Sequence, residues 1–493
     1  MRVLKKFALA LLALVLGLVA MVAVNTWRHG SRQLEVPPAE RIALDEAGLA
    51  RRLAGSLRFK TISTHDNADA SADQFDGLHA YLRQSYPKVF GTLKLEQVGR
   101  SLLLTWPGTD ATAPPVAWMA HQDVVPIAPG TEGNWAAPPF DGVVRDGFVW
   151  GRGSWDDKGN LIAQLEAVEQ LLGQGFQPRR TLYLVFGHDE EVGGIHGAKA
   201  IAELLQSRNV RLDYVLDEGL LITDGVMPGL KAPAALIGIA EKGYLSVGLS
   251  VTASPGHSSM PPARGGSAIA MMSAALQRLE NDQMPAAIRG VAREMFETIA
   301  PEMSGFQRVA LSNLWLFGPV VQKQLERGAS TNAMMRTTTA LTIVNAGSKD
   351  NVLPGRADAT VNFRLLPGDT REGLMAHVNS HTHAVDERFE LTQLPGSSEP
   401  SPISPTAAPA YQRLNRTVRE VFPGTLVAPG LMIGATDSRH FQAISDHIYR
   451  FSPVRATPED LPRFHGTNER IAIANLADMV RFYRRLLSAD LTP

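Results

Sequence analysis

Acidic residues and histidines recur in this sequence at the points where apolar, strand-like runs end. His121 and Asp123 follow the run from Val116 to Ala120. Residues two apart on a strand point to the same side, so both side chains can reach one space. A metal-bound histidine usually donates its other ring nitrogen to a carboxylate, and Asp123 stands where that carboxylate is needed. Taken alone, the pair is a weak signal, because a histidine at a strand end is more often a hydrogen-bonded structural residue.

Further segments carry groups of the same kind. Asp156 precedes a predicted helix that starts at Asn160, Glu190 and Glu191 follow the run 181–186, Asp217 follows the run 214–216, and His465 lies in a loop before the last predicted helix. Each has a simpler interpretation, because an aspartate can cap a helix and loop acids can be solvated. Like charges at a strand end, however, repel one another unless a cation or solvent relieves them.

The coincidence of these segments favours a metal site. Four of the five place a candidate ligand at the carboxyl end of a strand, the edge at which α/β sheets bind ligands. Two histidines, two unshared carboxylates and one bridging carboxylate would make a two-metal site. Because the chain has no cysteine, zinc held by nitrogen and oxygen is the natural assignment. A pair of zinc ions can polarise a carbonyl and generate hydroxide near neutral pH.

The order of predicted elements places these residues in an α/β domain. Up to residue 240, apolar runs alternate with amphipathic helical windows, which predicts a mostly parallel sheet with helices on both faces. Between residues 241 and 396 the order changes, which predicts an inserted α+β lid or dimerisation domain. The Pro- and Ser-rich segment 396–409 then leads back, so residues 37–240 and 397–493 form the two parts of the catalytic domain.

Residues 1–36 are predicted to be a signal anchor and linker. Arg2, Lys5 and Lys6 precede an uncharged run of 18 residues from Phe7 to Val24, which is enough to cross a bilayer as a transmembrane helix. Positive charge keeps the N-terminus in the cytoplasm, so the catalytic domain is expected to be exported, in a periplasmic, extracytoplasmic or luminal space. The alternative is a cleaved signal peptide, which would make the protein secreted.

Composition and charge exclude several other classes of function. At 493 residues the chain is about three times the usual domain length, so it is no lone binding module. Its 48 basic and 49 acidic residues form no long block of one sign, so nucleic acid is not an expected partner. Dinucleotide binding is disfavoured because Asp156, in the segment Gly151–Gly159, would repel a pyrophosphate.

After residue 40 the sequence resembles the M20 family of metallopeptidases. Within it, the similarity is to the carboxypeptidase S and Gly-X carboxypeptidase branch, which includes secreted N-acyl amino acid hydrolases. The resemblance is carried by H-Q-D-V-V-P, G-R-G-S-W-D-D-K-G, G-H-D-E-E-V-G-G, L-D-E-G, G-H-S-S-M-P-P, G-A-T-D-S-R-H-F and H-G-T-N-E-R-I, in family order. It implies two Zn²⁺ per subunit, with Co²⁺ or Mn²⁺ as possible substitutes.

The resemblance also assigns roles to individual residues. It implies that His121 and Asp217 hold one zinc, that Glu191 and His465 hold the other, and that Asp156 bridges them. Asp123 would orient His121, and Glu190 would be the general base that takes a proton from the bridging water and passes it to the leaving amine. In related enzymes the bond after the bridging aspartate is cis, which predicts a cis bond between Asp156 and Asp157.

Three more residues resemble substrate-binding positions of the family. His257 resembles the lid histidine that steadies the oxyanion, Asn332 the asparagine that contacts substrate, and Arg439 the arginine that grips a substrate carboxylate. In dimeric relatives His257 and Asn332 serve the partner's site, so the chain would act as a monomer or as a homodimer through the lid. The apolar stretch from Phe306 to Leu325 is interpreted as lid core, with an acyl-chain or membrane-facing groove as the alternative.

The resulting hypothesis is a membrane-anchored dizinc hydrolase that cleaves an amide bond next to a free carboxylate. Its expected activity is that of a carboxypeptidase on short peptides. The alternative is an N-acyl amino acid hydrolase that uses the same site, since in both reactions the leaving group is an amino acid. A binding protein that had lost the reaction is disfavoured, because it would have no chemical reason to keep Glu190 beside Glu191.

Overall fold

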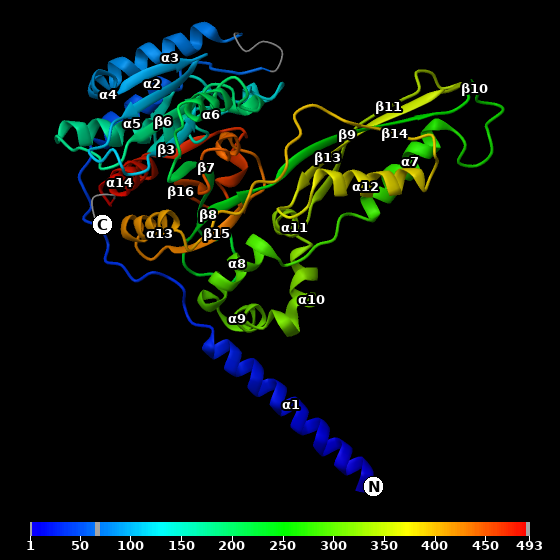
Figure 1. Ribbon diagram of the computed structural model, residues 1–493. Helices are drawn as coiled ribbons and strands as arrows, with labels where there is room; N and C mark the ends of the chain where they lie inside the picture. Colours follow the sequence, from blue (N-terminus) through cyan, green and yellow to red (C-terminus); the bar gives the residue numbers. More distant parts are fainter. Residues whose placement is uncertain (1, 65–69, 490–493) are drawn as a thin grey trace.

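The computed structural model describes residues 2–64 and 70–489 (Figure 1). Its largest sheet has eight strands in the order β1-β2-β6-β3-β7-β16-β8-β15. In that order the strands are Lys94–Val98, Ser101–Trp106, Leu182–Gly187, Val116–His121, Tyr214–Thr223, Ile448–Ala456, Ala234–Glu241 and Leu426–Met432. The late strands β15 and β16 thus complete a sheet that the first half of the chain begins.

The sheet is mixed, whereas the sequence predicted a mostly parallel one. The central strands β6, β3, β7 and β16 run parallel to one another, and β15 runs parallel to β8. The strands β1 and β2 pair antiparallel, as do β2 with β6 and β8 with β16. The difference arises because β1 and β2 are joined by a tight turn, which reverses the chain without a crossover helix.

Helices cover both faces of this sheet, as predicted. On β3, Val116, Trp118 and Ala120 pack into one buried cluster, and Ala117 and Met119 pack into another on the opposite face. The first face is covered by α2 (Glu46–Ser56), α3 (Ala72–Ser85), α4 (Pro87–Thr92), α5 (Lys158–Gly173), α13 (Pro409–Val421) and α14 (Ile473–Ala489). The second face is covered by α6 (Ala198–Ser207). Because both faces are buried, the strand ends are where polar side chains can meet.

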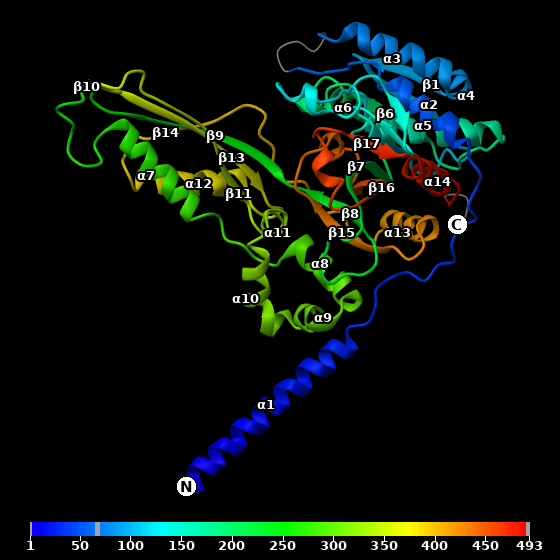
Figure 2. The same ribbon diagram turned by 180° about the vertical axis from the view of Figure 1, so that it is seen from behind.

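A second sheet stands apart from the first and has its own core (Figures 1 and 2). Its strands have the order β11-β13-β9-β14, with bounds Thr338–Ala346, Arg356–Leu365, Gly243–Thr252 and Glu390–Gln393. The helices α7 (Ala268–Asn281) and α12 (Arg371–His383) pack against it. At its far tip the short strands β10 (Gly256–His257) and β12 (Val352–Leu353) pair. This unit, hereafter the lid, lies within the segment predicted as an insertion.

The middle of that segment does not join the lid. It forms α8 (Gly290–Ile299), α9 (Gly305–Ser312), α10 (Leu314–Leu325) and α11 (Ala329–Met335). Met295 and Phe296 of α8 pack in one cluster with Ala428 of β15, so this helix is seated on the edge strand of the large sheet. The stretch interpreted as lid core is therefore outside the lid core.

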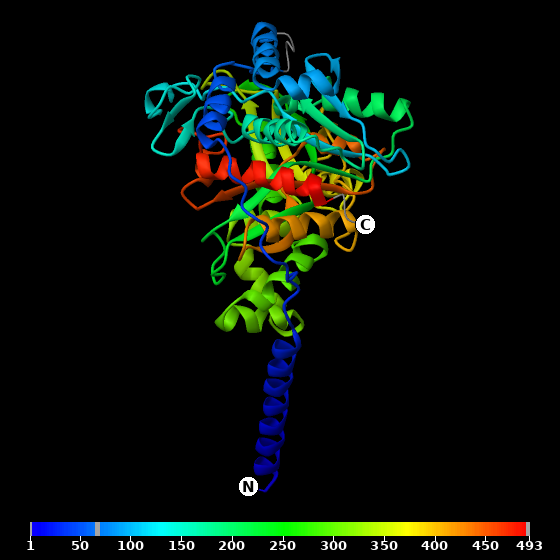
Figure 3. The same ribbon diagram turned by 90° about the vertical axis from the view of Figure 1, so that its left-hand side faces the viewer.

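The N-terminal helix α1 (Arg2–Arg28) extends away from the rest of the molecule (Figures 1 and 3). It is the one helix in the described residues that is long and apolar enough to cross a membrane. No residue of α1 is buried, although Val22, Asn25 and Thr26 near its end are partly covered. A signal sequence would have the same length and composition, so α1 is a candidate span.

Candidate metal centre

The strand β3 ends at His121, whose ring lies between two carboxylates. Its Nε2 atom is 3.0 Å from Oδ1 of Asp156, and its Nδ1 atom is 3.3 Å from Oδ1 of Asp123. All three side chains are buried. Asp123 therefore contacts the Nδ1 atom of His121, and the Nε2 atom points at Asp156.

Asp123 also fixes the turn that carries Glu190 and Glu191. Its carboxylate accepts hydrogen bonds from the main-chain N–H groups of Glu190 at 3.2 Å and Glu191 at 3.1 Å, and from the Ser63 hydroxyl at 2.5 Å. Burial raises the pKa of Asp123, but the hydrogen bond with His121 and the others outweigh it and hold that pKa below its usual value. An ionised Asp123 thus ties the end of β3 to the turn after β6.

Asp156 lies between two histidines from distant parts of the chain. Its Oδ2 atom is 2.6 Å from Nε2 of His465, and the same nitrogen is 3.4 Å from Oε1 of Glu191. The peptide bond between Asp156 and Asp157 is cis, as predicted. One buried carboxylate therefore presents one oxygen to each histidine, as a ligand shared by two metal ions must.

Two groups of potential ligands share Asp156. One contains His121, Asp156 and Glu218, and the other Asp156, Glu191 and His465, with the ligand atoms in each group within 4.8 Å of one another. Oε1 of Glu191 is buried and has no hydrogen-bond partner among the described residues. The structure thus brings together His121, Asp156, Glu191 and His465, and all their donor atoms are nitrogen or oxygen, which suits zinc.

The structure places Glu218 in the first group, where the sequence predicted Asp217. Both oxygens of Asp217 accept main-chain hydrogen bonds, from Glu218 at 2.9 Å and from Ser438 at 2.8 Å. Neighbouring residues on a strand point to opposite faces, so only one of this pair can face Asp156. The strand β7 continues to Thr223, so both acids lie within the strand rather than at its end. The motif L-D-E-G alone does not indicate which face of the strand each side chain occupies.

The centre concentrates negative charge in a buried space. Burial raises the pKa of Asp157, Glu190 and Glu218 well above the usual range, and the charges of neighbouring carboxylates raise them further. For His465, burial lowers the pKa, but the neighbouring carboxylates of Asp156 and Glu191 raise it to about 10. The carboxylates therefore require a proton or another cation among them, and a metal ion held by these groups would supply that charge.

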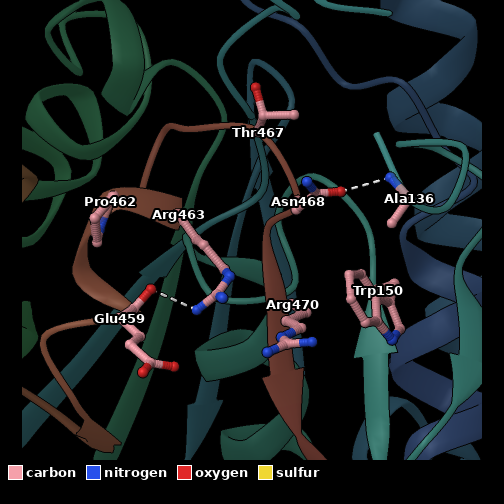
Figure 4. Close-up of a pocket in the computed structure, with 8 residues that line it drawn as sticks. All are labelled: Ala136, Trp150, Glu459, Pro462, Arg463, Thr467, Asn468 and Arg470. Atoms are coloured by element: carbon pink, nitrogen blue, oxygen red, sulfur yellow. Dashed lines mark hydrogen bonds between the residues drawn. The ribbon is translucent and has the colours of Figure 1, made fainter. Parts of the chain in front are cut away.

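The loop that carries His465 is held against a small sheet of the strands β17 (Arg470–Ala472), β5 (Phe148–Trp150) and β4 (Val143–Arg145). In Figure 4 the Asn468 side chain accepts a hydrogen bond of 2.6 Å from the main-chain N–H of Ala136. Beside it, the guanidinium group of Arg470 lies 4.5 Å from the centre of the Trp150 ring. These contacts fix the end of the loop that follows His465.

Glu469 is a positioning residue that the sequence analysis did not single out. It is fully buried, accepts a hydrogen bond of 2.6 Å from Arg152, and accepts further bonds from the main-chain N–H groups of Trp155 and Asp156. Arg152 in turn donates to the main-chain oxygen of His465 at 3.1 Å. Glu469 thus links the His465 loop to the Asp156 turn. Its place in H-G-T-N-E-R-I, the motif that begins with His465, was the available signal.

The three predicted substrate-binding residues lie at different distances from this centre. Arg439 donates to the main-chain oxygen of Gly193 at 2.8 Å, so it adjoins the turn after Glu191. His257 lies on β10, at the end of the lid away from the catalytic sheet (Figures 1 and 2), and is exposed. Asn332 lies on α11 at the base of the lid. The structure thus brings Arg439 close to the metal centre and leaves His257 far from it.

Comparison with known proteins identifies relatives over almost the whole chain. A family model described as peptidase family M20/M25/M40 matches residues 117–489. The chain is 40% identical to "Probable carboxypeptidase S-like 2" of Dictyostelium discoideum, with 96% of this chain and 92% of the relative covered. It is 41% identical to "N-fatty-acyl-amino acid synthase/hydrolase PM20D1" of Xenopus tropicalis, with 97% and 94% covered.

A solved structure supports the same fold. The M20 family metallo-carboxypeptidase Sso-CP2 from Sulfolobus solfataricus has a TM-score of 0.67 and 18% sequence identity, over 91% of this chain and 99% of that one. At 18% identity, the similarity is evidence for a shared fold and not for a shared activity.

Replacing Glu469 tests the link between the two halves of the centre. We expect Glu469→Gln to lower the free energy of unfolding by about 3 kcal/mol, because it leaves the buried Arg152 without its charged partner. Glu459→Gln, on the exposed part of the same loop, should change it by less than about 0.5 kcal/mol. Thermal unfolding of both variants measures the difference. Equal stability of the two would show that the Arg152 contact does not hold the loop.

Proposed function

The chain belongs to peptidase family M20/M25/M40, and from that membership we propose that it is a dizinc hydrolase. Its proposed reaction is cleavage of an amide bond beside a free C-terminal carboxylate, as a carboxypeptidase on short peptides. The observation that carries the proposal is the pair of ligand groups that share the buried carboxylate of Asp156. Two-metal sites of this kind hydrolyse amide and phosphate bonds.

The proposed ligands follow from the geometry of the two groups. His121 and Glu218 would hold one zinc, Glu191 and His465 would hold the other, and Asp156 would serve both. This assignment departs from the sequence prediction in one ligand. Asp217 positions the main chain of Glu218 and Ser438 instead of binding metal, because both of its oxygens already accept hydrogen bonds.

Bound zinc ions would polarise the substrate carbonyl and lower the pKa of a water molecule. The protein's own contribution begins with Glu190, which accepts a proton at its carboxylate and passes it to the leaving amine. Burial raises its pKa well above the usual range, and the charge of Asp437 adds to this. A carboxylate with a raised pKa can take up and release a proton near neutral pH.

Arg439 is the proposed group for the substrate carboxylate. Its guanidinium is partly exposed, donates to Gly193 next to the turn that carries Glu190, and has further N–H groups to offer a planar anion. His257 and Asn332 are proposed to act only when a lid closes on the centre, either the chain's own or that of a second subunit in a homodimer. The position of β10 at the tip of the lid supports this condition (Figure 2).

A second candidate, hydrolysis of N-acyl amino acids, is favoured by an observation outside the centre. Part of the stretch 306–325 is exposed, with Phe306, Trp315 and Val320 among the exposed apolar residues. It lies beside the end of α1, so a chain anchored there would work close to lipid-bearing substrates (Figure 3). The relative from Xenopus tropicalis carries a name that refers to N-fatty-acyl amino acids.

We further propose that α1 is kept as a membrane anchor, with the catalytic domain exported. The chain just after α1 is tied to the catalytic domain. The Gln33 side chain exchanges two hydrogen bonds with the main chain of Val427 on β15, and Arg419 donates to the main-chain oxygen of Leu34. These contacts support a fixed place for the end of α1.

Metal content decides whether Glu218 or Asp217 is the ligand that joins His121 and Asp156. We expect Glu218→Gln to lose one of two bound zinc ions, because it replaces a negatively charged ligand of the group His121, Asp156 and Glu218 with a neutral amide. Asp217→Asn should keep both ions but unfold at a lower temperature, since an amide replaces an acceptor of main-chain N–H groups. Mass spectrometry of the dialysed proteins measures the zinc. Loss of zinc from Asp217→Asn with full occupancy in Glu218→Gln would restore the original assignment.

Glu190→Gln tests the general base. The variant should bind two zinc ions as the unaltered chain does, and its kcat should fall by at least about a hundredfold, the usual contribution of general acid-base catalysis. Release of free amino acid, measured with zinc content on the same sample, checks both parts. A turnover near that of the unaltered chain would remove Glu190 from this role.

Chelation should weaken the fold more at high pH than at low pH. In the metal-free chain the raised pKa values of Asp157, Glu218 and His465 mean that the folded state binds more protons than the unfolded state. That stabilisation is complete below the unfolded pKa values and is lost as the pH rises through the folded ones. The difference in melting temperature between zinc-loaded and chelated protein should therefore widen from pH 5 to 8. A constant difference would contradict metal binding at these carboxylates.

A matched substrate panel separates the two candidate activities. The full chain in detergent, zinc-loaded or chelated, would be given dipeptides and long-chain N-acyl amino acids with the same C-terminal residue. We expect zinc-dependent release of that residue from dipeptides with the higher kcat/KM. A higher kcat/KM for the acyl substrates would favour the second candidate, and no zinc-dependent release from either class would contradict both.

A further inference from the structure

The helices α9 and α10 present apolar side chains to the outside of the molecule. Phe306 is 66% exposed, Trp315 55% and Val320 65%. One side of α10 packs inward, where Leu314, Val321 and Leu325 lie against the cluster beneath α8. The outward side, together with Phe306 of α9, is hereafter the α9–α10 surface. Packing in the protein core therefore does not explain why the α9–α10 surface is apolar.

The α9–α10 surface adjoins the end of the candidate membrane span. Asn313, between the two helices, is fully buried, and its amide donates to the main-chain oxygen of Val22 at 3.3 Å and to the Thr26 hydroxyl at 2.9 Å. One turn further on, His29 and Ser312 lie 3.2 Å apart. These contacts hold the last turns of α1 against the junction of α9 and α10, as Figures 1 and 3 also show.

From this juxtaposition we propose that the α9–α10 surface lies in the bilayer interface and is a second membrane contact of the exported domain. The proposal rests on the retention of α1 as a membrane span, which is part of the proposed function. Its occupant is the boundary between phospholipid headgroups and acyl chains. An amphipathic helix in that position lies in the plane of the membrane with its apolar side buried about 5–10 Å deep.

The dimensions of α1 place the surface at the right depth. The apolar run from Phe7 to Val24 is about 27 Å long at 1.5 Å per residue, close to the thickness of a bilayer's hydrocarbon core. Asn313 contacts α1 at Val22 and Thr26, at the end of this run. The helices α9 and α10 therefore contact α1 at the level of the membrane interface. Tryptophan is enriched at that level, where Trp315 would lie, and Lys323 is exposed on the same helix to reach lipid phosphates.

Membrane contact on two elements has a consequence for the catalytic domain. A single helix followed by a linker would let the domain rotate above the membrane. With α1, α9 and α10 all in contact with lipid, the domain has one orientation relative to the bilayer. The helix α8, which packs on β15 of the catalytic sheet, transmits that orientation to the metal centre.

The absence of cysteine from the chain makes a direct test possible. Single-cysteine variants of the full chain, Val320→Cys on α10, Leu14→Cys in α1 and Gln84→Cys on α3, would each be nitroxide-labelled and reconstituted in phosphatidylcholine vesicles. Residue 84 is an exposed helical position on α3, which lies at the end of the molecule opposite α1 (Figure 1). Spectroscopy with oxygen, which enters lipid, and a nickel chelate, which stays in water, measures the surroundings of each label.

The label at position 320 should resemble the one at position 14, with oxygen accessibility raised and nickel accessibility lowered relative to position 84. If position 14 is in lipid and position 320 is as open to nickel as position 84, the proposal is overturned and the anchor stands. If position 14 is also in water, both the anchor and the surface contact fail. Spin–spin broadening at position 320 that vanishes on dilution with unlabelled chain would assign the surface to a second copy, and would equally overturn the proposal.

Discussion

The rest of the structure depends on one constraint, the concentration of buried carboxylates around Asp156. Glu191, Glu218 and Asp157 lie close to it, and His121 and His465 are the nearest partners for its charge. Removing carboxylates from water costs free energy that is recovered only when a cation is placed among them. A fold that keeps so many acids together therefore favours bound positive charge, and the two groups of potential ligands share Asp156.

Holding the ligands in place requires contacts between distant parts of the chain. Asp123 joins the end of β3 to the turn of Glu190 and Glu191, and Glu469 joins the His465 loop to the turn of Asp156. Each of these acids accepts main-chain N–H groups, so it fixes backbone rather than a flexible side chain. The sheet supplies the framework, since β3, β6 and β7 are parallel neighbours that end on one edge.

Local pattern was sufficient to predict much of this arrangement. The alternation of apolar runs with helical windows predicted a sheet covered on both faces, and the position of His121 at the end of one run predicted that its side chain would reach a polar space. The choice between Asp217 and Glu218 was not predictable from pattern, because it depends on which face of β7 meets Asp156. The exposure of Phe306, Trp315 and Val320 was equally hard to predict, since an apolar run has the same sequence in a core as beside a membrane span. The seating of α8 outside the lid depends on its contact with β15, which lies late in the chain.

Anomalous X-ray scattering from crystals of the zinc-loaded chain, recorded at the zinc absorption edge, tests the central claim most directly. The account predicts two peaks, one on each side of Asp156, each about 2 Å from a ligand atom. One peak should be coordinated by His121 and Glu218 and the other by Glu191 and His465. A single peak, or a peak coordinated by Asp217 in place of Glu218, would contradict the account.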